Sequence, residues 1–148
     1  MFRFFRGAAP ILAVALGLLT VSTSSAQDPT RFEGEVKAFL EEAPIAHDSS
    51  LIIFTGSSSV RFWSTLAEDF PQHNVINRGF GGSHMSDLDY YLDDLVLKHK
   101  PSMVLIYEGD NDIADGELPG DILKEAVAIV ERLQAADSTM AIAFISPK

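Results

Sequence analysis

From about residue 30 onward, short apolar runs alternate along the chain with longer stretches in which apolar and polar positions follow helical spacing. Runs rich in β-branched and aromatic residues are typical of buried strands. They cover residues 51–55, 74–77, 102–107 and 140–145. Helical spacing predicts helices over residues 30–43, 60–67, 86–97 and 119–136. Strands that alternate with helices of this length predict an α/β fold with a parallel sheet.

Local signals indicate where three of these helices begin. Thr30 and Glu33 have the spacing of a capping box, in which each side chain satisfies a backbone N–H of the other residue. Ser86 and Asp89 give a second cap signal, and Pro119 suits a first helical position. The residues expected to face the core are Phe32, Val36, Phe39, Leu40, Leu88, Leu92, Leu95, Val96, Ile122, Ala126, Ile129 and Leu133.

The loops that follow the strands carry the unusual residues of the chain. In a parallel sheet with right-handed crossovers, such loops lie at the same edge. A flavodoxin-like strand order of 2-1-3-4 places the switch point between the first and third strands. Residues 57–59 and 109–112 then border one crevice, with residues 79–83 beside them. We therefore expect three separate loops to form one site.

Residues 1–26 have the layout of a secretory signal peptide. Two arginines make a basic start, residues 8–19 are apolar, and a small polar stretch leads to a cleavage point before Gln27. The apolar stretch is shorter than the roughly 20 residues that a membrane-spanning helix needs. The sequence therefore predicts an exported protein, periplasmic or secreted, without stable membrane insertion after cleavage. A single domain is expected over residues 27–148.

The composition narrows the range of partners. The formal net charge is −10, and removing residues 1–26 takes away two arginines and no acid, which leaves −12. Such a charge argues against nucleic acid or an anionic membrane as a partner. The chain has no cysteine, so an exported domain of this sequence depends on core packing without disulfides.

The loop residues suit acyl transfer. A serine nucleophile needs a positioned hydroxyl, a base that takes its proton, and N–H donors for the oxyanion that develops on the substrate. Gly56 ends the first strand and is followed by three serines. The glycine-rich turn at residues 79–83 can bring a backbone N–H close to a substrate, and the Asn111 amide can supply a second donor.

Three motifs resemble the first three sequence blocks of the GDSL/SGNH hydrolases, in the family's order and each after a predicted strand. They are Phe54-Thr55-Gly56-Ser57-Ser58-Ser59, Asn77-Arg78-Gly79-Phe80-Gly81-Gly82 and Gly109-Asp110-Asn111-Asp112. The resemblance implies a three-layer α/β/α, flavodoxin-like fold and a serine esterase that hydrolyses small or carbohydrate-linked acyl esters through an acyl-enzyme, with no metal and no cofactor. It aligns Ser58 with the nucleophile, and Gly82 and Asn111 with the backbone and side-chain oxyanion donors.

Two features depart from the family pattern. Ser57 stands where the family has aspartate, and the adjacent serines leave the register of the nucleophile open. The family's Asp-x-x-His block, which supplies the general base and its orienting acid, has no match. The chain thus resembles the N-terminal portion of a hydrolase, truncated after the fourth strand. We expect little esterase activity from this chain alone, and association through an uncovered fourth strand.

None of the four histidines is assigned a catalytic role. His84 directly follows the glycine-rich turn and is the nearest substitute for the missing base. A triad base also needs an orienting acid at fixed geometry, and we expect His84 to face solvent where the next helix begins. His47, His73 and His99 lie in a loop, before a strand and at a basic helix end.

The same loops allow other interpretations. Residues 110–121 superficially suggest a calcium loop, but the oxygen ligand at position 5, the glycine at 6 and the glutamate at 12 are missing. Asp112 is expected instead to fix its loop through backbone N–H groups. A non-catalytic module that binds a small molecule or an anion, such as phosphate or a flavin, is the alternative function. Phe62 and Trp63 either join the core, which we favour, or line a pocket.

Overall fold

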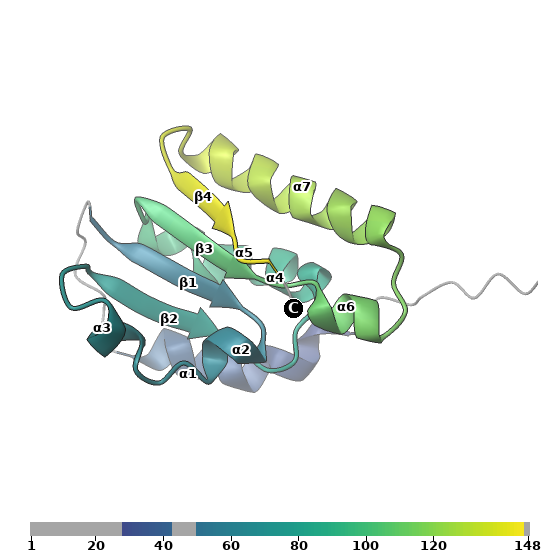
Figure 1. Cartoon of the computed structure of the whole chain (residues 1–148), viewed down its shortest axis with the longest axis horizontal. Helices are drawn as coiled ribbons and strands as arrows, with labels where there is room; N and C mark the ends of the chain where they lie inside the picture. Colours follow the sequence, from purple (N-terminus) through teal and green to yellow (C-terminus); the bar gives the residue numbers. More distant parts are fainter. Residues whose placement is uncertain (1–27, 43–49, 147–148) are drawn as a thin grey trace, which may run out of the picture.

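The computed structural model describes residues 28–42 and 50–146. Within them, a four-stranded parallel sheet has the order β2-β1-β3-β4 (Figure 1). Its strands are β1 (Ile52–Gly56), β2 (Val75–Gly79), β3 (Met103–Tyr107) and β4 (Ala141–Phe144). Each overlaps a predicted strand, and the order is the flavodoxin-like one. The predicted α/β fold with a parallel sheet is therefore confirmed.

The strand register brings three carboxyl ends level. Gly56 at the end of β1 lies opposite Gly79 of β2 and Tyr107 of β3. The loops after these strands consequently leave the sheet side by side. The topology thus fixes the edge at which a site can form.

Helices of very different length surround the sheet. They are η1 (Pro29–Phe32), α1 (Glu33–Glu41), α2 (Ser58–Arg61), α3 (Leu66–Asp69), α4 (Met85–Tyr90), α5 (Leu92–Leu95), η2 (Leu97–His99), α6 (Asp110–Ala114) and α7 (Pro119–Ala136). α7 has the predicted bounds. The prediction of one helix over residues 60–67 is wrong, because α2 and α3 are separate. The predicted helix over residues 86–97 is likewise divided among α4, α5 and η2.

Two predicted helix starts are wrong by two residues, and local hydrogen bonds explain both. Asp28, not Thr30, is the first cap, since its Oδ1 accepts the Thr30 N–H at 3.0 Å. His84, not Ser86, is the N-cap of α4, where the Asp87 carboxylate accepts the His84 N–H at 2.9 Å. In both places an aspartate satisfies a backbone donor that the helix leaves free.

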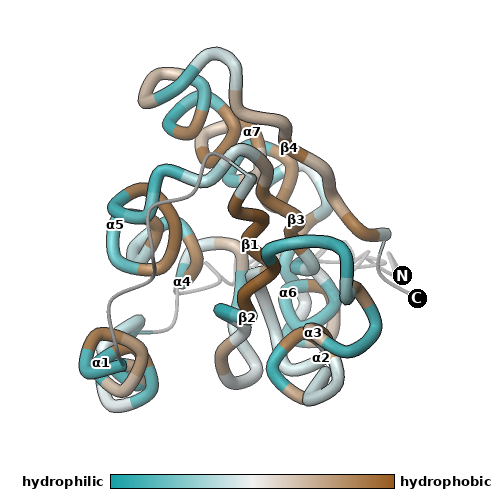
Figure 2. The backbone as a smooth tube through the Cα atoms, turned by 90° about the vertical axis from the view of Figure 1, so that its left-hand side faces the viewer, coloured by the Kyte–Doolittle hydropathy of each residue, from teal (hydrophilic) through white to brown (hydrophobic). Residues whose placement is uncertain are grey.

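The sheet separates two unequal cores, which gives the molecule three layers (Figure 2). Side chains from α1, α4, α5 and α7 form the larger core on one face, and α2 and α3 cover the other face. The fully buried side chains of the larger core include Ile53, Phe80, Leu88, Leu92, Leu95, Val96, Ile106, Ile129 and Leu133. Burial of this apolar surface is the main stabilising contribution. Leu40, which was expected in the core, is 44% exposed.

No helix in the described part of the chain is both long enough and apolar enough to cross a membrane. The predicted signal peptide, residues 1–26, lies outside the described residues.

Candidate active site

Backbone contacts hold the ends of the first three strands together. Gly56 has a φ of +119°, and a Cβ there would lie 2.1 Å from the Tyr107 carbonyl oxygen, so only glycine fits between these strand ends. Directly after it, the Ser57 N–H donates to the same carbonyl at 2.9 Å, and the Phe80 N–H donates to the Gly56 carbonyl at 2.9 Å. The three loops therefore start from one hydrogen-bonded edge.

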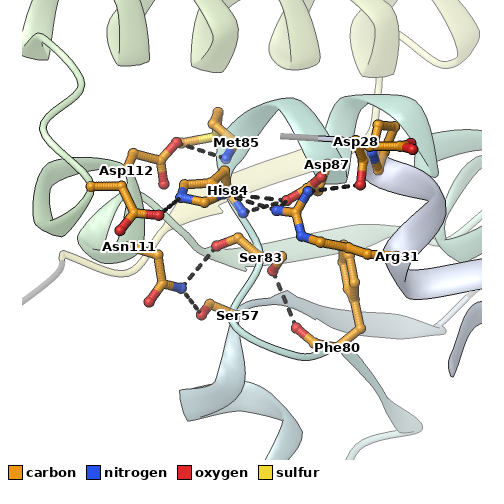
Figure 3. A network of polar contacts seen from close by, with 12 residues as sticks. Asp28, Arg31, Ser57, Phe80, Ser83, His84, Met85, Asp87, Asn111 and Asp112 are labelled. Atoms are coloured by element: carbon orange, nitrogen blue, oxygen red, sulfur yellow. Dashed lines mark hydrogen bonds and ion pairs between the residues drawn. The ribbon is translucent and has the colours of Figure 1, made fainter. Parts of the chain in front are cut away.

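The Asn111 side chain connects the three loops (Figure 3). Its Nδ2 donates to the Ser57 hydroxyl at 2.6 Å and to the Ser83 carbonyl at 2.9 Å. A residue of the third loop thus contacts both the first loop and the glycine-rich turn. The serine in contact with Asn111 is Ser57, which is fully buried.

Ser58 lies beside this contact, at the first position of α2. It is half-buried, while Ser59 is exposed. No hydrogen bond joins the Ser58 hydroxyl to another residue in the described part of the chain. Of the three adjacent serines, Ser58 therefore combines partial enclosure with a free hydroxyl.

Gly82 lies next to the Asn111 amide, on the side that faces solvent. It is exposed, and a Cβ there would lie 3.9 Å from both Nδ2 and Oδ1 of Asn111. The preceding Gly81 N–H donates to the Glu35 carboxylate of α1 at 3.1 Å. Its Cβ position is blocked at 2.2 Å by the Phe32 ring. Phe32 of η1 and Glu35 of α1 therefore hold the glycine-rich turn in place.

A buried acid that the sequence analysis did not single out lies under the loops. Glu108 directly follows β3 and is 3% exposed. Burial raises the pKa of its carboxyl well above the ordinary value, and the nearby Asp112 carboxylate adds to the rise. Its partner is the buried Ser83 hydroxyl, which also lies 3.2 Å from the Phe80 carbonyl. A protonated Glu108 can therefore donate to Ser83 while Ser83 donates to Phe80.

The prediction that His84 faces solvent is wrong. The residue is 3% exposed, and its Nδ1 lies 3.0 Å from the Arg31 guanidinium (Figure 3). Its Nε2 lies 2.9 Å from the Asp115 carboxylate. Because a guanidinium can only donate, Nδ1 accepts and Nε2–H donates to Asp115. Arg31 also forms an ion pair with the buried Asp87. His84 thus joins η1, α4 and the end of α6 behind the glycine-rich turn.

Asp112 fixes its loop through a backbone N–H, as predicted. It is fully buried, and its Oδ1 accepts the Met85 N–H at 2.8 Å. This bond joins α6 to the start of α4. It therefore holds the neighbouring Asn111 against the glycine-rich turn.

The two aromatic residues after the serines have different environments. Trp63 packs edge-on against Phe54, with 5.6 Å between ring centroids, and lines a surface pocket of about 470 Å³ beside α1 and β2. None of the three candidate site residues lines this pocket. Phe62 is 74% exposed, so the prediction that it joins the core is wrong.

No family model matches the sequence, and the comparison with curated proteins gives no match. Solved structures do match. A candidate acylhydrolase from Bacteroides fragilis has a TM-score of 0.64 and 20% identity over 80% of this chain and 58% of its own. A GDSL-like lipase from Bacteroides thetaiotaomicron has a TM-score of 0.61 and 19% identity over 79% and 57%. The chain has the fold of the GDSL-like hydrolases.

An acetyl xylan esterase is similar as well, with a TM-score of 0.57 and 23% identity over 66% of this chain and 58% of its own. The chain spans less than two thirds of the length of each of these structures. The GDSL-like fold confirms the resemblance at the level of architecture. It also agrees with the meeting of the three motif loops at one sheet edge.

Proposed function

We propose that the chain is part of a serine ester hydrolase in which Ser58 is the nucleophile. The Gly82 N–H and the Asn111 amide would hold the oxyanion. The observation that carries the proposal is the position of the Asn111 amide, which contacts the serine loop and the glycine-rich turn at one edge. The hydrolases among the structures with this fold support the reaction class.

Access favours Ser58 over its neighbours as the nucleophile. Ser57 is fully buried, and its hydroxyl already accepts a hydrogen bond from Asn111. Ser59 is exposed and is the next residue of α2 after Ser58. A nucleophile must reach a substrate carbonyl while the oxyanion donors lie close by, and Ser58 meets both conditions best.

Hydrolysis would take two steps. The Ser58 Oγ attacks the ester carbonyl carbon as a base takes its proton, and the resulting oxyanion accepts hydrogen bonds from Gly82 and Asn111. Collapse of this intermediate expels the alcohol, which takes up the proton, and leaves an acyl-serine. Water attacks the acyl-serine in the same way and releases the acid.

The Asn111 amide has to change one contact during this reaction. Both of its hydrogens are engaged, one with the Ser83 carbonyl and one with the Ser57 hydroxyl. The Ser83 bond fixes the orientation of the amide. The oxyanion would replace the Ser57 hydroxyl. The hydroxyl is a weaker acceptor than the oxyanion because it carries no charge.

The base has to come from outside the residues described above. His84 is the histidine next to the glycine-rich turn, and both its ring nitrogens are engaged by Arg31 and Asp115. We therefore propose that activity requires the Asp-x-x-His block of the family. This chain alone would retain at most about 10³–10⁴-fold acceleration over water from the oxyanion donors and binding.

The proposed substrates are acyl esters of small alcohols or carbohydrates. The similarity to an acetyl xylan esterase supports a carbohydrate-linked ester. The signal-peptide layout of residues 1–26 supports action outside the cytoplasm. Export also suits a polymeric substrate that cannot enter the cell.

The test uses p-nitrophenyl acetate and a version of the chain extended by a GDSL-type C-terminal segment that carries Asp-x-x-His. Turnover should fall by about 10⁴-fold or more in Ser58→Ala. The matched control is Ser59→Ala, which should retain most of the activity. Undiminished turnover in Ser58→Ala would contradict the assignment, and loss in Ser57→Ala alone would move the nucleophile to Ser57.

A further inference from the structure

Three carboxylates from α6, from the loop after it and from α7 come together next to the Asn111 loop. Asp112, Glu117 and Glu125 each place a carboxylate oxygen within 4.8 Å of the other two. The Glu117 N–H donates to the Asp112 carbonyl at 2.9 Å, which fixes these two residues relative to each other. The cluster is therefore built by the fold and joins two helices.

Two of these acids have a buried oxygen without a hydrogen-bond partner. Asp112 is fully buried, and while its Oδ1 accepts the Met85 N–H, its Oδ2 has no partner among the described residues. The Oε2 of Glu125 is also buried without a partner there. A buried carboxylate oxygen that gains no donor costs free energy. Both oxygens belong to residues of the same cluster, and a bound cation would satisfy them.

The charges around the cluster also favour a ligand with positive charge. None of the described lysines or arginines forms an ion pair with any of the three acids. Both ring nitrogens of His84 are engaged outside the cluster, by Arg31 and Asp115.

We propose that Asp112, Glu117 and Glu125 bind a divalent cation, Ca²⁺ in preference to Mg²⁺. Ligands that are all carboxylate oxygens select hard cations. Mg²⁺ demands near-octahedral geometry at about 2.0–2.1 Å and gives up its water reluctantly, whereas Ca²⁺ accepts flexible geometry at about 2.3–2.6 Å. Carboxylates that come from a loop and two different helices therefore suit Ca²⁺ better than Mg²⁺. Water would complete the coordination.

This site differs from the calcium loop that the sequence excludes. That template takes its ligands from twelve consecutive residues, whereas the ligand set here combines the loop with Glu125 of α7. Its expected effect is structural, because a bound cation would tie α7 to the helix that carries Asn111. The inference does not depend on ester hydrolysis.

The test is a titration of CaCl₂ into the full 148-residue chain at pH 8, after treatment with a chelator and in 0.1 M KCl. Calorimetry should show a saturable heat with one Ca²⁺ per chain. The melting temperature should rise with CaCl₂ concentration by mass action. MgCl₂ at the same ionic strength should produce a smaller rise.

Variants separate this site from general attraction of cations to an acidic chain. Glu117→Gln and Glu125→Gln keep the size of each side chain, and each should weaken Ca²⁺ binding about ten-fold or more. Without Ca²⁺, Glu125→Gln should melt at or above the wild-type temperature, because it relieves repulsion in the cluster. The matched control is Glu131→Gln, an exposed position on α7, which should bind like the wild type.

The results decide the proposal in either direction. Loss of the saturable heat in the two glutamine variants, with binding retained in the control, would support it. Absence of heat in the wild type, or equal binding in the wild type and in the Glu117→Gln/Glu125→Gln double variant, would overturn it. Neither readout involves an ester, so failure here would leave the proposed hydrolase function standing.

Discussion

The Asn111 side chain shows how a single residue can fix the geometry of three loops. Its two amide hydrogens are divided between Ser57 and Ser83, which belong to different loops. An aspartate at position 57, as in the GDSL/SGNH pattern, would offer the same amide a charged acceptor, whereas Ser57 offers it a neutral one. Under the proposed function, position 57 therefore acts on the oxyanion donor and not as a nucleophile.

Glu108 provides a prediction about stability and pH. Burial raises its pKa in the folded state, so the folded protein keeps a proton that the unfolded chain releases above about pH 4.5. Stability that is present below that pH is lost as the pH rises toward the folded pKa. Glu108→Gln replaces the carboxyl by an amide that does not titrate. The difference in free energy of unfolding between this variant and the wild type should therefore grow by up to about 1.4 kcal/mol per pH unit above about pH 4.5.

The measurement for Glu108 is urea denaturation of both proteins between pH 4 and pH 8. The free energies of unfolding should be similar near pH 4 and diverge above it, with Glu108→Gln the more stable protein. Parallel curves over this range would show that the carboxyl titrates alike in the folded and unfolded states.

The sequence predicts which residues lie together where a motif is local, and it misses contacts between residues that are distant in the chain. Gly82 and Asn111 come from short motifs at strand ends, so the topology alone brings them together. His84 pairs with Arg31 and Asp115, which are 53 and 31 residues away. Because no local pattern reports such a pairing, the sequence placed a buried histidine in solvent.

At the scale of elements, length decides how well the sequence predicts a helix. α7 has 18 residues and begins with Pro119, so its own periodicity defines it. α2 and α3 have four residues each, too few to be stable without tertiary contacts. The Asn77 amide donates to the Val60 carbonyl at 2.6 Å, a contact from β2 that helical periodicity does not report.

Gly56 tests the packing of two strand ends. Gly56→Ala would place a methyl group 2.1 Å from the Tyr107 carbonyl oxygen, at a φ of +119°, so β1 and β3 would have to separate. We expect the free energy of unfolding to fall by about 2 kcal/mol or more. The matched control is Gly34→Ala in α1, where no atom lies within 4 Å and alanine should stabilise by up to about 1 kcal/mol.

Chemical denaturation of both glycine variants checks this expectation. Equal stability of Gly56→Ala and the wild type would mean that the strand ends tolerate a side chain. The serine loop would then be less tightly held against the third loop than the contacts around Gly56 indicate.

At the scale of the whole molecule, apolar surface is distributed unevenly. β4 pairs with β3 and, within the described residues, with no other strand. Phe144 on β4 is 42% exposed. Leu118, directly before α7, is 68% exposed, and Leu123 and Val127 on α7 are 63% and 45% exposed. An unpaired strand edge next to exposed apolar side chains favours pairing with another chain. The fold class was predictable from alternating strands and helices, and so was this open edge at the fourth strand.

The open edge of β4 should make the chain associate in solution. Light scattering after size exclusion should give an average mass above that of the monomer, rising with protein concentration, since the described part of each molecule offers the same unpaired strand edge. Phe144→Lys places a charge beside the edge and should lower the average mass, because pairing would bury an uncompensated ammonium group. Gln134→Lys adds the same charge at an exposed position of α7 and should leave association unchanged. A monomer at every concentration, or equal association in both variants, would mean that the β4 edge is not the contact.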